Sequence, residues 1–216
     1  RKLLELIPFF YMDELTKEDI TRNKTYEEQI DRVSTRKNFS NIQDYLKSLN
    51  INIKLYFDET KIIKRMSQIT QKTNQFNLTT QRYSELEIKS FLENSEFSLI
   101  AISVSDNFGD SGVTGLSIIQ YVDEKTAIID SLILSCRVLG RKIEYVFLDL
   151  IINYLKEKKI ELVKSSYVTT LKNDQVLYYY DNNKFTLIKS SDNKKEYYLQ
   201  ISKYVPNNIQ YIKVNN

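Results

Sequence analysis

The sequence predicts an α/β (α+β) protein in which a mixed, mostly antiparallel and twisted sheet is flanked by helices. Three runs rich in β-branched and apolar residues, at 97–106, 113–123 and 126–136, are typical of neighbouring strands. Short polar turns separate these runs, and the first of them contains Gly, Asn and Asp, as in an antiparallel hairpin. A long helix is expected over 142–159, and because most of its surface is apolar it must pack against a sheet.

Residues 1–50 are polar and carry several patterns typical of helix starts. Capping-box sequences occur at 16–19 and 25–28, and a further short helix is expected to begin at 40–43. Apolar residues are too sparse here for an independent core. We therefore interpret this region as a helical linker or arm that packs on something else.

The main domain is expected at 51–204, followed by a C-terminal tail at 205–216. Its elements alternate between strands and helices in an order that restricts the fold. In sequence these are a strand at 51–57, a helix at 58–73, a helix opened by a capping box of Ser84 and Glu87, the three strands, the long helix, a strand at 161–168, a helix at 172–183 and two strands around a turn at 192–195.

Composition excludes several classes of function. The 31 basic and 28 acidic residues leave a net charge of +3 without a basic stripe, so nucleic-acid binding is not expected. No apolar run reaches about 18 residues, so no membrane association is expected either. The single cysteine rules out an internal disulfide and favours a reducing, cytoplasmic location. Histidine is absent, which removes Ser–His and Cys–His catalysis and leaves no expected metal site.

A basic turn joins the third antiparallel strand to the long helix. A helix start carries unpaired amide hydrogens and a partial positive charge, and a glycine lets the backbone approach an anion closely. Arginines add charge-assisted hydrogen bonds, so the turn is interpreted as a phosphate site, with a solvated helix-capping turn as the alternative. The candidate anion-binding residues are Ser135, Arg137, Val138, Leu139, Gly140, Arg141 and Lys142.

In this element order the region resembles the GNAT-fold acyltransferases, which hold the pyrophosphate of an acyl-CoA at a Q/R-x-x-G-x-G/A motif. Arg137 and Gly140 match that motif, whereas Lys142 stands where glycine or alanine is usual. The resemblance implies coenzyme A, or the 4'-phosphopantetheine of a carrier protein, as the ligand. It also implies a ligand cleft where the strands ending near Cys136 and Val168 splay apart.

A downstream segment is similar to a second GNAT pattern, N-x-x-A-x-x-aromatic-Y-x-x-x-G-F. Asn173, Tyr180 and Phe185 fit that pattern, while Val176 and Lys184 depart from it. The resemblance implies that Asn173 contacts pantetheine and that Tyr180 is a candidate general acid toward the leaving thiolate. Ordinary packing is the alternative for Tyr180 in a chain of 16 tyrosines.

Three stretches, 68–88, 104–116 and 129–144, resemble the C-terminal portion of the FkbH-like proteins of HAD subfamily IIIC. The resemblance implies an upstream HAD domain, with a D-x-D-x-T motif, that passes a glyceryl unit from bisphosphoglycerate to an acyl carrier protein. Such chemistry serves methoxymalonyl-carrier and polyketide biosynthesis, and relatives occur among polysaccharide genes. No D-x-D occurs in this chain, and its start at Arg1 rather than Met favours a HAD domain that has been cut away over one that was lost.

Further candidates lie outside the basic turn. Asp130 falls inside an apolar strand, where it needs a partner such as Arg137 or a backbone amide, or serves as a base. Cys136 is either a reactive thiol able to accept an acyl unit or a small buried core residue. A polar loop is interpreted either as a site for a polar acyl group or as a loop that satisfies its own hydrogen bonds. Its candidate substrate-binding residues are Asn74, Gln75, Asn77, Thr79, Thr80 and Arg82.

Three functions stay open on the sequence. The domain binds coenzyme A or a carrier's phosphopantetheine arm and assists acyl transfer, with Tyr180, Cys136 and Asp130 as the catalytic candidates. Alternatively, it docks the acyl carrier protein or the HAD domain without chemistry of its own. The third function, a free-standing N-acetyltransferase, is disfavoured by Lys142 and by the FkbH-like stretches.

Overall fold

The structure is a computed structural model that describes residues 17–215, with side chains from residue 27 onward. The chain divides into two compact units, one ending at Tyr45 and one beginning at Leu46. In the first unit, helix α1 (Lys17–Arg36) is continuous, so the capping box expected at 25–28 is not a helix start. The one expected at 16–19 begins outside the described residues. Helix α2 (Ile42–Ser48) follows a cap in which Asn41 Oδ1 accepts from the Gln43 amide at 2.8 Å.

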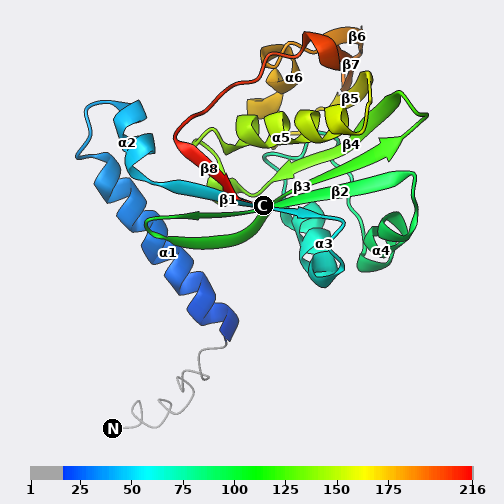
Figure 1. Ribbon diagram of the computed structural model, residues 1–216. Coiled ribbons are helices and arrows are strands. Elements are labelled where there is room, and N and C mark those ends of the chain that lie inside the picture. Colours follow the sequence, from blue (N-terminus) through cyan, green and yellow to red (C-terminus); the bar gives the residue numbers. More distant parts are fainter. Residues whose placement is uncertain (1–16, 216) are drawn as a thin grey trace, which may run out of the picture. The chain divides into compact units, whose positions relative to one another are not determined.

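The main unit is built on one eight-stranded sheet, which confirms the mixed, mostly antiparallel architecture (Figure 1). The strand order is β6-β7-β5-β4-β3-β2-β1-β8. Among the strands of the described residues, β4 with β5 and β1 with β8 pair in parallel, and the other neighbours are antiparallel. The strands are β1 (Ile51–Phe57), β2 (Phe97–Asp106), β3 (Gly109–Tyr121), β4 (Thr126–Leu134), β5 (Leu162–Val168), β6 (Thr186–Ser190), β7 (Lys194–Gln200) and β8 (Ile212–Asn215).

Helices cover both faces of this sheet (Figure 1). Helix α5 (Ile143–Glu157) lies on one face, and α3 (Ile63–Lys72) and α4 (Glu85–Glu93) lie on the other. The capping box of Ser84 and Glu87 at the start of α4 is formed as expected. The helix expected at 172–183 consists of a 3-10 turn (Asp174–Val176) and the short helix α6 (Tyr179–Asn182).

Both helical layers rest on continuous apolar packing, as the sequence pattern predicts. On one face, Met66 and Ile69 of α3 and Ile88 of α4 pack with Leu99 and Ile133 of the sheet. Helix α5 buries seven apolar side chains on the opposite face, which explains its almost wholly apolar sequence. These are Ile143, Val146, Phe147, Leu148, Ile151, Ile152 and Leu155.

The tail expected at 205–216 is in part a strand of the same sheet. Strand β8 pairs in parallel with β1, with Ile212 beside Ile51. Ile212 is buried, and because β1 would otherwise be an edge strand, β8 covers its free backbone groups. A four-residue strand is too short to give a clear alternating pattern, which is why the sequence predicts a tail here rather than a strand.

Within the described residues, none of the helices combines the length and apolar character needed to cross a membrane. The same residues contain no cluster of three or more acidic or cysteine side chains suited to a metal ion.

Candidate ligand site

The expected splay between β4 and β5 is present. The two strands pair in parallel only over 126–129 and 162–165, after which β4 continues to Leu134 and β5 to Val168. Where parallel strands diverge, each leaves backbone N–H and C=O groups that need other partners. The opening is therefore a site for an extended chain that carries amides.

The chain's own residues 76–78, hereafter the inserted segment, occupy this opening on the β4 side. The Leu134 amide donates to Phe76 O at 2.9 Å, and the Leu78 amide donates to Leu132 O at 3.3 Å. Asn77 forms an antiparallel bridge with Ile133 between these two bonds. The inserted segment thus pairs with β4 as a short additional strand.

The inserted segment is also bound on the β5 side. The Val168 amide donates to Leu78 O at 2.8 Å, and Asn173 Nδ2 donates to Asn77 O at 3.1 Å. Phe76 packs edge-on against Tyr179, with ring centroids 5.0 Å apart. Backbone groups of both diverging strands are therefore satisfied by this one piece of the protein.

Removing the inserted segment would be costly. Phe76 is 2% exposed and Leu78 is fully buried, and burial of such side chains contributes about 1.5–3 kcal/mol each. The four hydrogen bonds contribute about 0.5–1.5 kcal/mol each. Withdrawal from the opening would therefore cost on the order of 5–12 kcal/mol before any ligand bound there.

Asn173, the expected pantetheine contact, is completely buried and fully engaged. Besides its bond to Asn77 O, Nδ2 donates to Val168 O at 2.9 Å. Its Oδ1 accepts from Tyr167 Oη at 2.9 Å and from the Thr170 amide at 2.8 Å. A side-chain amide has about four such bonds to make, so this one has none left for a ligand.

Tyr180, the candidate general acid, is 1% exposed and lies in an aromatic cluster with Phe185 and Tyr197. Its hydroxyl, close to Ser165, makes no hydrogen bond to any described residue. Burial, and then the charge of Asp130, raises the pKa of this phenol. The structure thus favours the packing interpretation of Tyr180.

The two arginines of the basic turn differ in placement. Arg141 points inward, where its guanidinium forms a buried ion pair with Asp106 at 2.6 Å. It also donates to Arg137 O at 2.6 Å, which braces the turn. Arg137 is exposed, so of the two it is the one available to an anion.

The start of α5 contains a carboxylate where an anionic ligand was expected. Gly140 and Leu139 line a hollow of about 130 Å³ together with Glu144, whereas Val138 is buried. Burial raises the pKa of Glu144, and its Oε2 makes no hydrogen bond within the described part of the chain. Lys142 caps the helix in the left-handed region, with φ of 62°, a conformation that glycine adopts more readily than lysine.

A larger pocket, of about 640 Å³, lies on the α3 side of the turn. Cys136 is exposed at this pocket, so it is not a buried core residue. Ser135 lines the pocket beside it. Four cations complete the lining, and among the described residues no acidic side chain joins them. We call this the basic pocket and define it by Arg65, Lys72, Arg137 and Lys172.

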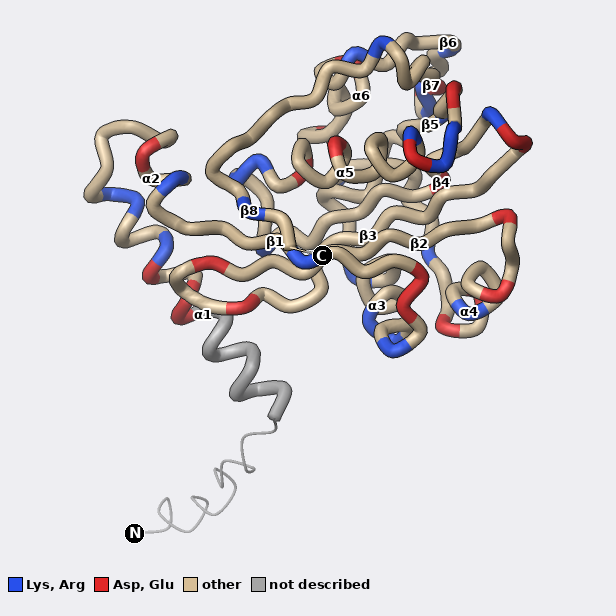
Figure 2. The backbone as a smooth tube through the Cα atoms, viewed as in Figure 1, with Lys and Arg blue, Asp and Glu red and all other residues tan. Residues whose placement is uncertain are grey.

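The charges of the basic pocket are not neutralised by the protein. Arg65 Nε donates to Val113 O at 2.9 Å, and its pKa is lowered by burial and then by the nearby charge of Arg137. Within the described residues, Lys72, Arg137 and Lys172 take part in no ion pair. Like charges held together without a counterion favour an anionic ligand. Figure 2 shows the basic positions along α3.

Most of the polar loop after α3 satisfies its own hydrogen bonds. Asn77 Oδ1 accepts from the Thr80 amide at 2.9 Å, and the Thr79 hydroxyl lies 3.4 Å from that of Ser131. Arg82 donates to Asn74 Oδ1 at 2.5 Å and to the backbone at the end of α3. For much of this loop, the structure therefore favours a loop that satisfies its own hydrogen bonds over a site for a polar acyl group.

Two members of the expected substrate-binding set reach the basic pocket. Asn74 and Gln75 line it directly. An adjoining hollow of about 520 Å³ shares Asn74 and Lys172 with the basic pocket and is also lined by Thr80 and Arg82. The amides of Asn74 and Gln75 are thus the part of the loop placed to contact a ligand in the basic pocket.

Asp130 has a structural partner other than those expected. Its Oδ2 accepts from Tyr83 Oη at 2.7 Å and from the Ser131 hydroxyl at 2.9 Å, rather than from Arg137 or a backbone amide. Burial, and then this hydrogen bond to Asp130, raises the pKa of Tyr83. Asp130 therefore links β4 to the segment that leads into α4.

Sequence reasoning missed Arg65 and Lys72 as site residues. They are seven positions apart on α3, which puts them on one face of the helix, with buried Ile69 between them. This spacing was visible in the sequence. It did not identify a site, because the position of α3 beside the basic turn depends on the fold.

No protein-family model matches this sequence, and no curated protein matches it. Solved structures do match in three dimensions. Ard1 from Thermoplasma volcanium superposes with a TM-score of 0.54 at 15% identity, covering 68% of this chain and 97% of that one. The ribosomal-protein-S18-alanine N-acetyltransferase from Escherichia coli gives 0.54 at 14% identity, covering 72% and 97%. The GNAT domain of S. lividans PAT gives 0.54 at 10% identity, covering 68% and 89%.

These similarities show the fold. The main unit has the GNAT acetyltransferase fold, as the element order and the Arg137 to Lys142 motif led us to expect. At identities of 10–15%, sequence likeness to these structures assigns no residue a role. Function has to be argued from the site itself.

Proposed function

We propose that this GNAT-fold unit binds the 4'-phosphopantetheine arm of an acyl carrier protein at the basic pocket and assists transfer of a glyceryl-type acyl unit. The observation that supports this best is the group of four unneutralised cations beside an exposed thiol. A phosphodiester is the anion that such an arm presents near its attachment to the carrier. Arginine and lysine bind phosphate oxygens through charge-assisted hydrogen bonds.

The proposed chemistry uses the thiol of Cys136. In a thiol exchange, its sulfur attacks the carbonyl of an incoming acyl thioester, the carbon–sulfur bond of that thioester breaks, and the cysteine proton passes to the leaving thiolate. The thiol of the arm then attacks the carbonyl of acyl-Cys136, the bond to Cys136 Sγ breaks, and the arm's thiol proton passes to Sγ, so that the acyl unit leaves on the carrier. Asn74 and Gln75 are near enough to the same pocket to hydrogen-bond the hydroxyls of a glyceryl group. Coenzyme A would present similar chemistry with a bulkier, more charged pyrophosphate.

The FkbH-like stretches support the proposed partners, an acyl carrier protein and an upstream HAD domain. Carrier proteins are acidic, so the basic pocket and exposed Lys142 would attract them from a distance. In this proposal the HAD domain supplies the phosphoryl chemistry, and the unit described here receives or positions the arm.

A second function is favoured by one specific observation. Because the inserted segment fills the β4–β5 opening and Tyr180 is buried, the usual acyl-transfer positions of the fold are inaccessible. The unit would then dock the carrier without chemistry of its own. Cys136 separates the two functions, since only the first requires its sulfur.

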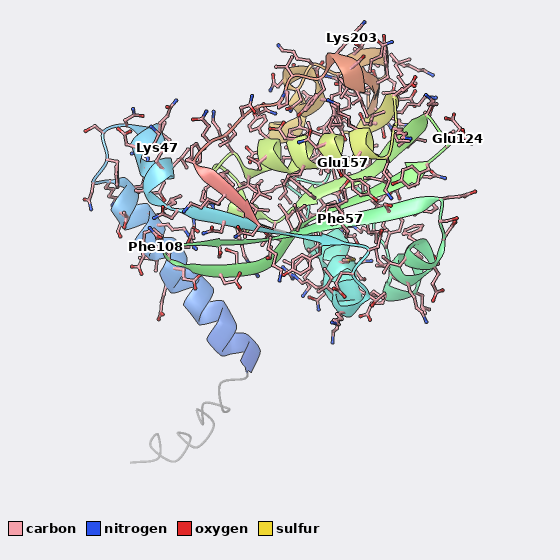
Figure 3. The ribbon with its side chains drawn as sticks, viewed as in Figure 1. Lys47, Phe57, Phe108, Glu124, Glu157 and Lys203 are labelled. Atoms are coloured by element: carbon pink, nitrogen blue, oxygen red, sulfur yellow. The ribbon has the colours of Figure 1, made fainter. Side chains whose placement is uncertain are left out.

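The test is calorimetric titration of the whole 216-residue chain with 4'-phosphopantetheine, pantetheine and coenzyme A at low and high salt. We expect 4'-phosphopantetheine to bind more tightly than pantetheine, and high salt to weaken it. Arg137→Ala should weaken it about 10–100-fold, since a hydrogen bond to a charged group contributes about 1.5–3 kcal/mol. Lys203→Ala is the matched control, because that lysine is exposed (Figure 3) and lines neither the basic pocket nor the adjoining hollow.

Equal binding of pantetheine and 4'-phosphopantetheine would contradict a phosphate site in the basic pocket. Tighter binding of coenzyme A than of 4'-phosphopantetheine would restore the acetyltransferase alternative. If Cys136→Ser binds normally but no acyl group ever transfers to the wild-type thiol, the docking function stands.

A further inference from the structure

We infer that residues 76–78 are a permanent internal strand that determines ligand choice, because they exclude extended amide-bearing ligands, including the pantetheine chain of free acyl-CoA, from the β4–β5 opening. This inference rests on the geometry of the opening and is independent of the proposed carrier-binding function. It concerns whether a ligand can bind in the β4–β5 opening or only in the basic pocket.

The opening offers a defined set of hydrogen-bonding groups. The amides of Leu134 and Val168 donate, the carbonyl of Leu132 accepts, and Asn173 Nδ2 donates. An extended chain of alternating amide N–H and C=O groups is the chemistry that satisfies this set. A peptide or a pantetheine chain would fit, and the inserted segment already makes every one of these bonds.

Both ends of the inserted segment are fixed to neighbouring structure. On its N-terminal side, the Thr73 amide closes α3 by donating to Ile69 O at 3.1 Å. On its C-terminal side, Asn77 Oδ1 holds the Thr80 amide in a tight turn, in which Thr80 has φ of 60°. Arg82 then ties the returning chain to the end of α3. The segment therefore has little freedom to swing out as a unit.

The buried contacts are too extensive for a ligand to displace them easily. The cost of withdrawing the inserted segment would lower the affinity of a ligand for the opening by at least about a thousandfold, because each 1.4 kcal/mol is a factor of ten. A ligand that binds the basic pocket from the α3 side avoids this cost entirely, since that pocket exists with the segment in place. The inserted segment thus favours ligands held by their anionic group over ligands held along an amide chain.

Amide hydrogen exchange measured by NMR tests the inference in the wild-type protein. We expect the amides of Leu78, Leu134 and Val168 to exchange as slowly as core amides of β2 such as Ile100, with or without millimolar coenzyme A. Exchange of these amides at the rate of exposed loops would overturn the inference. So would coenzyme A that binds by replacing their hydrogen bonds.

A variant that loosens the inserted segment tests the same inference. Leu78→Ala should loosen the segment, speed exchange at Leu134 and Val168 by at least about tenfold relative to β2, and increase the affinity for pantetheine. Leu199→Ala is the matched control, because that buried leucine is in β7 rather than the opening. If the first variant fails to fold, the wild-type exchange pattern still decides the question.

The two proposals fail separately. A wrong carrier-binding proposal would appear as loss of any effect of 4'-phosphopantetheine on the basic pocket, with the Leu134 and Val168 amides still protected. A wrong inference about the inserted segment would appear as fast exchange of those two amides, whatever binds at Arg137.

Discussion

At the scale of single residues, charged side chains close together in the sequence have very different surroundings. Arg141 is buried against Asp106, whereas Arg137, four positions earlier, is exposed in the basic pocket. The motif identified both as phosphate ligands, since neither their identity nor their spacing shows which one points inward. Asp106 accepts from the Phe108 and Gly109 amides in the hairpin turn, and it is also the counterion of Arg141.

The different roles of these arginines predict different effects on stability. Arg141→Ala should lower the free energy of unfolding by about 3–5 kcal/mol, because it removes one partner of a buried ion pair. Arg137→Ala should change it by less than about 0.5 kcal/mol, as expected for an exposed side chain. Urea denaturation of both variants measures this. Equal losses would contradict the buried ion pair.

Glu144 predicts a pH dependence. Burial raises its pKa in the folded protein above the ordinary value of 4.5, so the native state binds more protons than the unfolded state just above that pH. Its contribution to stability therefore falls as pH rises through this interval. Glu144→Gln should raise the melting temperature at pH 7, and the gain should disappear below pH 4.5.

The control for this prediction is Glu124→Gln. Glu124 is exposed in the turn between β3 and β4 (Figure 3), so its replacement should leave the melting temperature nearly unchanged at either pH. A Glu144→Gln variant that is less stable than the wild type at pH 7 would show that the carboxylate has a stabilising partner.

Cys136 predicts a chemical reactivity. Because its side chain is exposed in the basic pocket, iodoacetamide should label it in the native protein without denaturant. Mass spectrometry of intact protein over time measures the labelling. Labelling that occurs only after unfolding would show that Cys136 is buried in the native protein.

At the scale of elements, the sequence predicted most helices and strands because periodicity and turn chemistry are local. The three strands around the hairpin turns and the apolar α5 are clear examples. The inserted segment could not be predicted in this way. Its sequence around Asn74 to Thr80 is polar and typical of a loop, and its partners Leu132 and Val168 are distant in the chain.

The start of α5 predicts an effect of backbone conformation. Lys142 adopts a left-handed conformation that costs a non-glycine residue about 1–2 kcal/mol. Lys142→Gly should therefore raise the free energy of unfolding by about 0.5–1 kcal/mol after the greater unfolded-state entropy of glycine is included. Lys156→Gly, inside the same helix, should lower it by about 1 kcal/mol. Destabilisation by both substitutions, measured in urea, would contradict the strain at Lys142.

At the scale of the whole molecule, the fold can be predicted from local sequence patterns, whereas the residues that line the basic pocket depend on how the elements pack. The element order together with the Arg137 to Lys142 motif predicted the GNAT architecture, which solved structures confirm. The site was predicted only in part. Arg137, Cys136, Asn74 and Gln75 meet at one pocket, but Arg65 and Lys72 enter it only because of how α3 packs.

The central claim is that a phosphate-bearing ligand binds the basic pocket while the β4–β5 opening stays filled. An NMR titration of the whole chain with 4'-phosphopantetheine tests this most directly. The account predicts concentration-dependent shifts of the Lys72, Cys136 and Arg137 amides, with those of Leu78, Leu134 and Val168 unchanged. Shifts confined to Leu78, Leu134 and Val168, with none at Arg137, would contradict it.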